Sequence, residues 1–342
     1  MPWRCGHRWQ TSAKFPCPAR KGISAVFQVD PLDRLVAPQQ YRRFEDILQR
    51  RARLVHYTSA EAALLILSNR SIWLRNTLFM NDFSEIEYGL ELFGEYFHGQ
   101  HPARAAFWGV VDRTTGGRAK ALQELFDGWV PDLSTGTFIC SLSEHLNHED
   151  GLGRLSMWRA YGRPNGVALV INPLYLASQN DALGAFSYPI EYCDKPQAQK
   201  LFEELERSIV GSEAFLATRT PDEVYNAVFY AFQTLALTIK HPGFAEELEW
   251  RVVYRPAPQP SPLLKGKLVS IGGAPQKIFE LPLENVPGSG VTAISPAELV
   301  DHLIIGPCIH AYAMRHALIE ALEDAGVADP AQKVFCSNIP VR

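Results

Sequence analysis

The chain has 342 residues, of which 46% are hydrophobic and 20% charged, a composition typical of a folded globular protein. The 33 Lys and Arg residues against 37 Asp and Glu give a net charge of −4. This balance excludes a protein that coats nucleic acid or anionic lipid through an overall positive charge. No apolar run reaches the length of about 18 residues that a membrane-spanning helix requires.

The N-terminal region and the cysteines carry little structural information. Six cysteines are spread along the chain without a C-x-x-C pair, which argues against a zinc ribbon or a disulfide scaffold and favours the reducing cytoplasm. Cys5, His7 and Cys17 lack a fourth zinc ligand nearby. The first stretch is basic without an apolar signal-peptide core, so we expect residues 1–40 to be a loosely ordered leader.

From Tyr41 onward, short strands and helices alternate irregularly. The sequence predicts strands at 54–57, 71–74, 137–143, 166–171, 186–192, 250–254, 268–271, 277–282, 302–306 and 333–337, and helices near 59–69, 83–98, 118–128, 196–210, 222–240 and 310–325. This order predicts a single α+β domain over 41–342 with a helical insert near 195–243. No G-x-G-x-x-G or P-loop motif occurs, which disfavours those nucleotide sites.

The first strand ends in His56, Tyr57 and Thr58, and Thr58 with Glu61 has the spacing of a capping box for the following helix. His56 therefore lies beside a helix N-terminus, where backbone N–H groups favour anions. Two roles stay open for His56: contact with a ribose or phosphate, or packing against the sheet.

The second strand carries Arg75 and leads into Asn81 and Asp82, which precede an amphipathic helix. Asp82 with Glu85 has the pattern of an N-terminal cap, and Asn81 that of a turn. Arg75 either reaches a phosphate or is solvated.

Alternation along 137–144 directs Ser141 and Ser143 to one face of a strand and Cys140 to the other. Paired hydroxyls suit a ligand amide or ribose, or else mark an edge strand with a solvated face. Further on, Trp158 and Tyr161 share one side of a helical turn, which indicates packing or ring stacking.

A strand over 247–254 places Glu247, Glu249 and Arg251 on one face. A carboxylate beside an arginine stays ionised at neutral pH, as stabilisation of a developing cation requires. An ordinary cross-strand salt bridge is the alternative.

Together these segments resemble a known family. HYTS, WLR with FMND-x-x-E, FICSLS, MW-x-x-YG, E-x-E-W-R and LIIGP occur in the order of an uncharacterised bacterial family, domain of unknown function 2971, over Arg53–Pro307. A strand His, a strand S-x-S and a strand E-x-E are also similar, in that order, to ADP-ribosyltransferases. The second similarity implies central mixed or antiparallel sheets that form a cleft surrounded by helices.

The similarity to ADP-ribosyltransferases also implies residue roles. His56 would contact the adenosine ribose of NAD, Ser141 and Ser143 would flank the nicotinamide pocket, Glu249 would be the catalytic carboxylate and Glu247 would position the acceptor. We therefore expect His56, Ser141 and Glu249 to meet in one cleft. The remaining NAD-binding residues would be Tyr57, Thr58, Arg75, Asn81, Trp158 and Arg251, with no metal required.

The function that this resemblance implies is an NAD-consuming ADP-ribosyltransferase or NAD glycohydrolase of the bacterial cytoplasm, acting as a toxin or anti-phage effector. Its acceptor would be a protein, a nucleic acid or water, and an antitoxin or regulator would be its partner. Two alternatives stay open: a metal-dependent nuclease or phosphoesterase that uses Asp82, Glu247 and Glu249 with His56, and a non-catalytic binding module.

Overall fold

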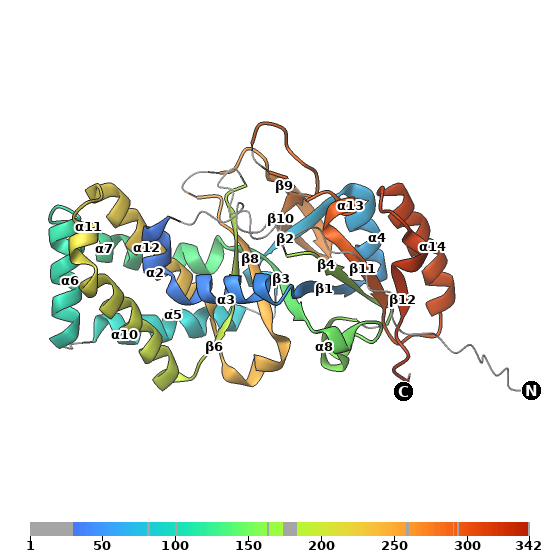
Figure 1. The fold of residues 1–342 in the computed structure, drawn as a ribbon, viewed down its shortest axis with the longest axis horizontal. Helices are drawn as coiled ribbons and strands as arrows, with labels where there is room; N and C mark the ends of the chain where they lie inside the picture. Colours follow the sequence, from blue (N-terminus) through green and yellow to red (C-terminus); the bar gives the residue numbers. More distant parts are fainter. Residues whose placement is uncertain are drawn as a thin grey trace, which may run out of the picture.

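The computed structural model describes residues 30–80, 83–99, 102–162, 164–173, 183–257, 260–289, 291–292 and 294–340. Within them the chain forms two lobes along its long axis (Figure 1). The sheet lobe contains the main sheet with α3 (Pro38–Gln49), α4 (Ala60–Asn69), α8 (Leu155–Tyr161), α13 (Pro296–Leu299) and α14 (Ala311–Asp324). The helical lobe contains α2 (Pro31–Val36), α5 (Phe83–His98), α6 (Pro102–Thr114), α7 (Ala119–Thr135), α10 (Lys195–Gly211), α11 (Glu213–Leu216) and α12 (Pro221–Thr238).

The main sheet has ten strands and is mixed. They are β1 (Arg53–Ser59), β2 (Ser71–Asn76), β3 (Phe138–His145), β4 (Gly166–Ile171), β5 (Ala185–Pro189), β8 (Glu249–Tyr254), β9 (Lys265–Ile271), β10 (Ala274–Pro282), β11 (Val300–Ile305) and β12 (Val334–Cys336). Their order is β12-β11-β4-β1-β3-β2-β10-β9, and β8 joins β3 to β5. Only β11 and β12 pair in parallel among these described strands. The predicted α+β class is confirmed at this level.

Strand β3 is the branch point of the sheet. One of its edges pairs with β8 from Phe138 to Ser143. Its other edge pairs first with β2, at Phe138 and Ile139, and then with β1, at Ser143 to His145. In these registers no strand covers residues 140–142 on that second edge. The split between β1 and β2 therefore exposes a short piece of β3 backbone inside the sheet.

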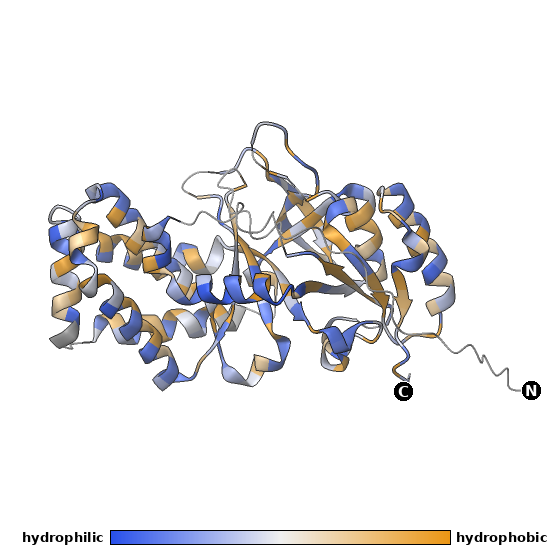
Figure 2. Cartoon of the chain, in the orientation of Figure 1, coloured by the Kyte–Doolittle hydropathy of each residue, from blue (hydrophilic) through white to orange (hydrophobic). Residues whose placement is uncertain are grey.

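The two faces of β3 and β8 belong to different hydrophobic cores. Cys140 and Val252 lie in the core beneath α3, α4 and α14, whereas Ile139 and Val253 lie in the core of the helical lobe. Strand alternation explains this division, because successive side chains point to opposite faces. In Figure 2 the central strands are coloured mostly as hydrophobic, and the helices carry alternating hydrophobic and hydrophilic stretches. The same two strands thus join the lobes.

The helical insert expected near 195–243 is formed by α10, α11 and α12. A two-stranded parallel sheet of β6 (Glu191–Tyr192) and β7 (Ile239–Lys240) holds the two ends of this insert next to each other. The turns η1 (Thr77–Phe79), η2 (Asn147–Glu149), η3 (Pro242–Glu247) and η4 (Pro330–Gln332) complete the described elements.

The structure corrects two sequence predictions in the first seventy residues. Helical structure begins at Pro31 rather than near Tyr41, because Asp30 caps α2 and Leu32 and Val36 are buried. Residues 1–29, with Cys5, His7 and Cys17, lie outside the described residues. The cap of α4 is Ser59, whose Oγ accepts from the N–H of Ala62 at 3.1 Å, and not Thr58, because β1 continues through Ser59.

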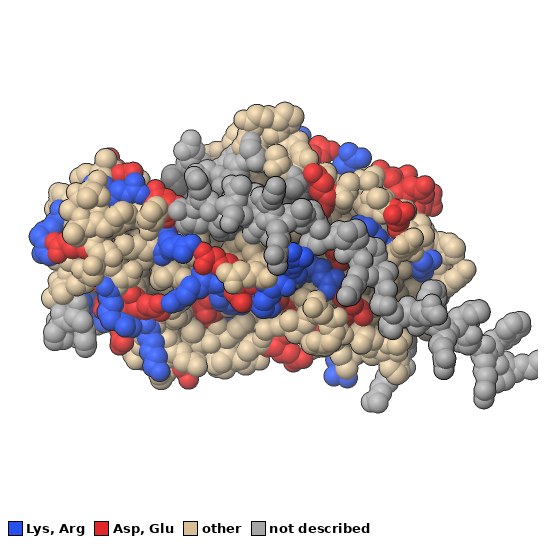
Figure 3. Space-filling model, viewed as in Figure 1, with Lys and Arg blue, Asp and Glu red and all other residues tan. Residues whose placement is uncertain are grey.

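The surface carries mixed charge. On the face drawn in Figure 3, basic and acidic side chains are interspersed along α3. Arg42 pairs with Glu204, Arg43 with Glu191 and Arg50 with Glu144, which links α3 to its neighbours. Among the described helices, none is both long and apolar enough to span a bilayer.

Candidate functional site

His56 fills the split between β1 and β2. Its Nδ1 lies 3.0 Å from the carbonyl oxygen of Ser141, in the middle of the unpaired edge of β3. A carbonyl only accepts, so Nδ1 carries the proton. Burial lowers the pKa of His56, and the hydrogen bond to Ser141 opposes this shift. At neutral pH the imidazole is thus neutral, and it replaces a missing strand partner.

Ser141, Glu249 and Arg251 meet on the opposite face of β3 and β8. Pairing places Ser141 opposite Arg251 and Ser143 opposite Glu249. The Ser141 hydroxyl donates to Oε1 of Glu249 at 2.8 Å, and Nε of Arg251 donates to the same oxygen at 2.8 Å. The face shared by Glu249 and Arg251 is therefore as the alternation predicted, although β8 begins at Glu249 rather than Glu247.

Lys240, which sequence reasoning missed, completes this cluster. From β7, its Nζ donates to Glu249 Oε2 at 3.1 Å and to Glu247 Oε2 at 2.6 Å. Glu249 is only 3% exposed. Burial raises its pKa, but Arg251 and Lys240 outweigh burial and lower the pKa to about 2. Both oxygens of Glu249 face cationic donors, which disfavours a metal ion there.

The structure does not bring His56 together with this cluster through side chains. Val55 lies opposite Ser143, so these two share a face, and His56, one residue on, points to the other face. Its contact with Cys140 Sγ at 3.8 Å agrees with that placement. Only the Ser141 backbone connects the imidazole to the hydroxyl and to Glu249.

Tyr57 and Trp158 pack against each other rather than line an opening. Their rings meet edge to face at 4.9 Å, and the Tyr57 hydroxyl accepts from the backbone N–H of Arg154. Gly162 and Gly306 approach the indole so closely that an added Cβ would come within 2.7 and 2.8 Å of its ring carbon. The described residues therefore enclose the Trp158 ring, which agrees with a packing role rather than with stacking on a ligand.

The other sequence-predicted residues are dispersed. Arg75 lies opposite Ile139, on the face of Ser141, and donates to the carbonyl of Phe79. Thr58 pairs with Val167 on the His56 side of β1. Ser143 is buried beside Glu249. Asn81 and Asp82 lie outside the described residues.

A second polar cluster was missed by the sequence analysis. His145 at the end of β3, Asp150 after η2 and His302 in β11 each offer a ligand atom, and these atoms lie within 4.8 Å of one another. The sequence carries only a weak signal for this cluster, because 157 positions, 302 minus 145, separate the two histidines. Only strand pairing through β1 and β4 brings them together.

One family model matches part of the chain. Residues 157–252 match the model of a family described as protein of unknown function (DUF2971). This match supports the resemblance to the DUF2971 family that the sequence motifs indicated. The matched DUF2971 segment contains Trp158, Lys240, Glu249 and Arg251. No curated protein and no solved structure matches the chain.

Proposed function

We propose that this chain cleaves the glycosidic bond between nicotinamide and ribose in NAD, with Glu249 as the carboxylate that stabilises the resulting cation. The observation that carries the proposal is the 2.8 Å hydrogen bond from Ser141 to Glu249. It joins the S-x-S strand to the E-x-E strand, two of the three motifs on which the similarity to ADP-ribosyltransferases rests.

The chemistry requires an ionised and oriented carboxylate. When the C1′–N bond breaks, its electron pair leaves with neutral nicotinamide, and positive charge develops on the sugar. An acceptor hydroxyl or water then bonds to C1′ and loses a proton. A fixed negative charge beside the sugar lowers the barrier, because its attraction to the sugar is stronger in the transition state than in bound NAD.

The Glu249 cluster meets part of this demand. Arg251 and Lys240 keep the carboxylate ionised and fix its direction. Ser141 is half-buried, and the Glu247 side chain is 20% exposed, so the cluster reaches solvent on those sides. In this proposal the Ser141 hydroxyl turns from Glu249 toward the sugar when NAD binds. His56 acts as a positioning residue that holds the Ser141 carbonyl.

The test measures nicotinamide release from NAD by the purified full chain and by Glu249→Gln. We expect the variant to be roughly 100- to 1,000-fold slower, the usual effect of removing one preorganised charge. Ser141→Ala keeps every ion pair of Glu249 and should reduce the rate without a loss of folding.

A matched control separates catalysis from stability. Glu206 is also a buried carboxylate, and it binds Arg104 in the helical lobe. Glu206→Gln should lose stability but retain nicotinamide release. Release that is absent in the wild type, or equal in the wild type and in folded Ser141→Ala and Glu249→Gln, would overturn the proposal and favour a non-catalytic binding module.

A further inference from the structure

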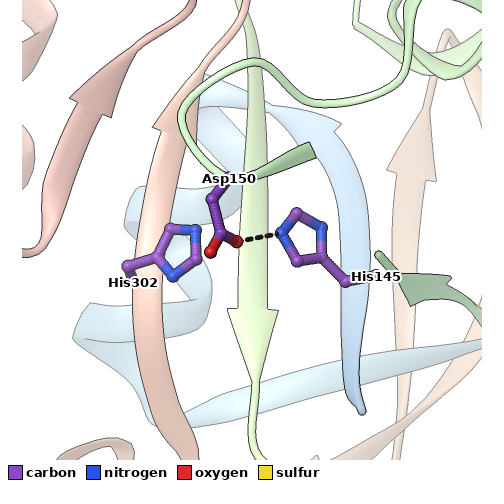
Figure 4. A group of neighbouring side chains, drawn as sticks. All are labelled: His145, Asp150 and His302. Atoms are coloured by element: carbon purple, nitrogen blue, oxygen red, sulfur yellow. Dashed lines mark hydrogen bonds and ion pairs between the residues drawn. The ribbon is translucent and has the colours of Figure 1, made fainter. Parts of the chain in front are cut away.

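Two histidines and one aspartate from three separate segments point toward one another in the sheet lobe (Figure 4). Nε2 of His145 lies 2.9 Å from Oδ1 of Asp150, and the rings of His145 and His302 have centroids 5.6 Å apart. The carboxylate of Asp150 lies between the two rings. The cluster is separate from Glu249 and plays no part in the proposed NAD chemistry.

His302 has a buried nitrogen without a partner. Its Nδ1 lies 2.7 Å from Oδ2 of Asp301, and a carboxylate only accepts, so Nδ1 carries a proton. The nitrogen left for the cluster is Nε2, which has no hydrogen-bond partner although the side chain is only 7% exposed. A buried polar atom without a partner costs free energy, and a lone pair beside a carboxylate is satisfied by a cation.

His145 contacts Asp150 directly. Its side chain is 0% exposed, and with Nε2 directed at Asp150, its Nδ1 lies 3.8 Å from Oε2 of Glu149. That Nδ1 also lacks a hydrogen-bond partner. Of the two histidines, His302 alone has the outer carboxylate bond that is typical of metal-binding histidines, since Asp301 fixes its ring and raises its basicity.

The local charge favours a cation. Asp150 and Asp301 both bind Arg53, and Glu149 binds Arg154. Three carboxylates therefore share two guanidinium groups, which leaves an excess of negative charge around the cluster. The pairing of β11 with β4 shifts register between Val300 and His302, so Asp301 lies at an irregularity of the strand. Such bulges redirect side chains near functional sites.

We infer that His145, Asp150 and His302 bind one divalent transition-metal ion, with Zn²⁺ the best fit. Two imidazole nitrogens with one carboxylate suit Zn²⁺, whereas Mg²⁺ and Ca²⁺ prefer oxygen ligands throughout. Three protein ligands leave a fourth position, as in open zinc sites. The Asp150 side chain is 47% exposed, so that position is accessible to water.

The test titrates chelator-treated full-length protein with Zn²⁺ alone, and separately with Mg²⁺, by calorimetry. We expect one Zn²⁺ per chain and much weaker binding of Mg²⁺. Asp301→Asn removes an outer carboxylate and should weaken Zn²⁺ binding about 10- to 100-fold. His302→Gln removes a ligand and should weaken it further. Zn²⁺ should also raise the melting temperature of the wild type but not that of His302→Gln.

His98 provides the matched control. It contacts Asp127 through Nε2 at 3.0 Å but is exposed. Among the described residues it belongs to no group of three side chains that could hold a metal ion. His98→Gln should leave the Zn²⁺ affinity unchanged. Absence of stoichiometric Zn²⁺ binding, or equal affinity in the wild type and in Asp301→Asn and His302→Gln, would overturn the inference. If His302→Gln does not fold, Asp301→Asn decides the question. Neither result bears on nicotinamide release.

Discussion

Glu249 is a buried carboxylate whose negative charge pairs with two buried cations. Replacing it with glutamine leaves the buried Lys240 and Arg251 without their shared partner. Removal of one member of a buried ion pair typically costs about 3–5 kcal/mol. We expect Glu249→Gln to lower the free energy of unfolding by about that amount at pH 7, measured by urea denaturation.

The same residue makes stability depend on pH. Its folded pKa of about 2 lies below the ordinary value of 4.5. A lowered folded pKa stabilises the fold above the unfolded pKa, and this contribution is lost as pH falls from 4.5 toward 2. The full contribution is about 3 kcal/mol. Wild type should therefore lose more stability than Glu249→Gln between pH 5 and pH 3, and equal losses would contradict this assignment.

Residue-level prediction succeeded where one strand was enough. Alternation correctly placed Ser141 and Ser143 on one face of β3, and Glu249 and Arg251 on one face of β8. It could not show that His56 points away from both. That relation depends on the register of β1 against β3, which pairs Val55 with Ser143, and no local pattern encodes the register of distant strands.

At the scale of elements, α4 tests the corrected cap. Ser59→Ala removes the acceptor of the Ala62 N–H and should destabilise the protein by about 1 kcal/mol. Ser59→Asp keeps an acceptor and adds favourable charge at the helix N-terminus, so it should cost little. Thermal or urea unfolding of both variants checks this, and equal losses would argue against Ser59 as the cap.

The contact between α5 and α12 depends on one glycine. A Cβ at Gly89 would overlap the carbonyl oxygen of Ala236, a backbone atom. Gly89→Ala should therefore destabilise the protein by at least about 1–3 kcal/mol. Gly128 in α7 is the control, because no atom lies within 4 Å of its added Cβ. Gly128→Ala should raise stability by about 0.5–1 kcal/mol.

Most elements could be predicted because they have clear periodicity or apolar runs. The ends of α5 agree with prediction, and Ile86, Phe93 and Phe97 of its stripe are buried. Helix α6 was missed because its apolar residues do not keep to one side of the helix. Helices α2 and α3 were not predicted, because the expected leader over residues 1–40 includes α2 and the start of α3.

At the scale of the whole molecule, β3 and β8 are shared by two cores. A mutation or denaturant that separates these strands disrupts both cores together. We expect one cooperative unfolding transition, observed at the same denaturant concentration by circular dichroism and by fluorescence of a single remaining tryptophan in either lobe. Trp108 reports on the helical lobe and Trp250 on the sheet lobe. Two separated midpoints would contradict the expected single domain.

The sheet order could not be predicted from the sequence. Strands β1 and β4 pair although 109 positions, 167 minus 58, separate Thr58 from its partner Val167. Strand β2 pairs with β10 across a still longer distance. Local patterns establish that strands exist, whereas their partners are chosen by packing over the whole chain.

The helical lobe is built from chain segments that leave the sheet and return to it. Its helices come from 31–36, 83–135 and 195–238, with sheet strands between them. No single cleavage of the backbone can release this lobe as an independent fragment. We expect a protease that cuts one exposed connection to give a nicked protein whose pieces stay associated during gel filtration and separate only in denaturant.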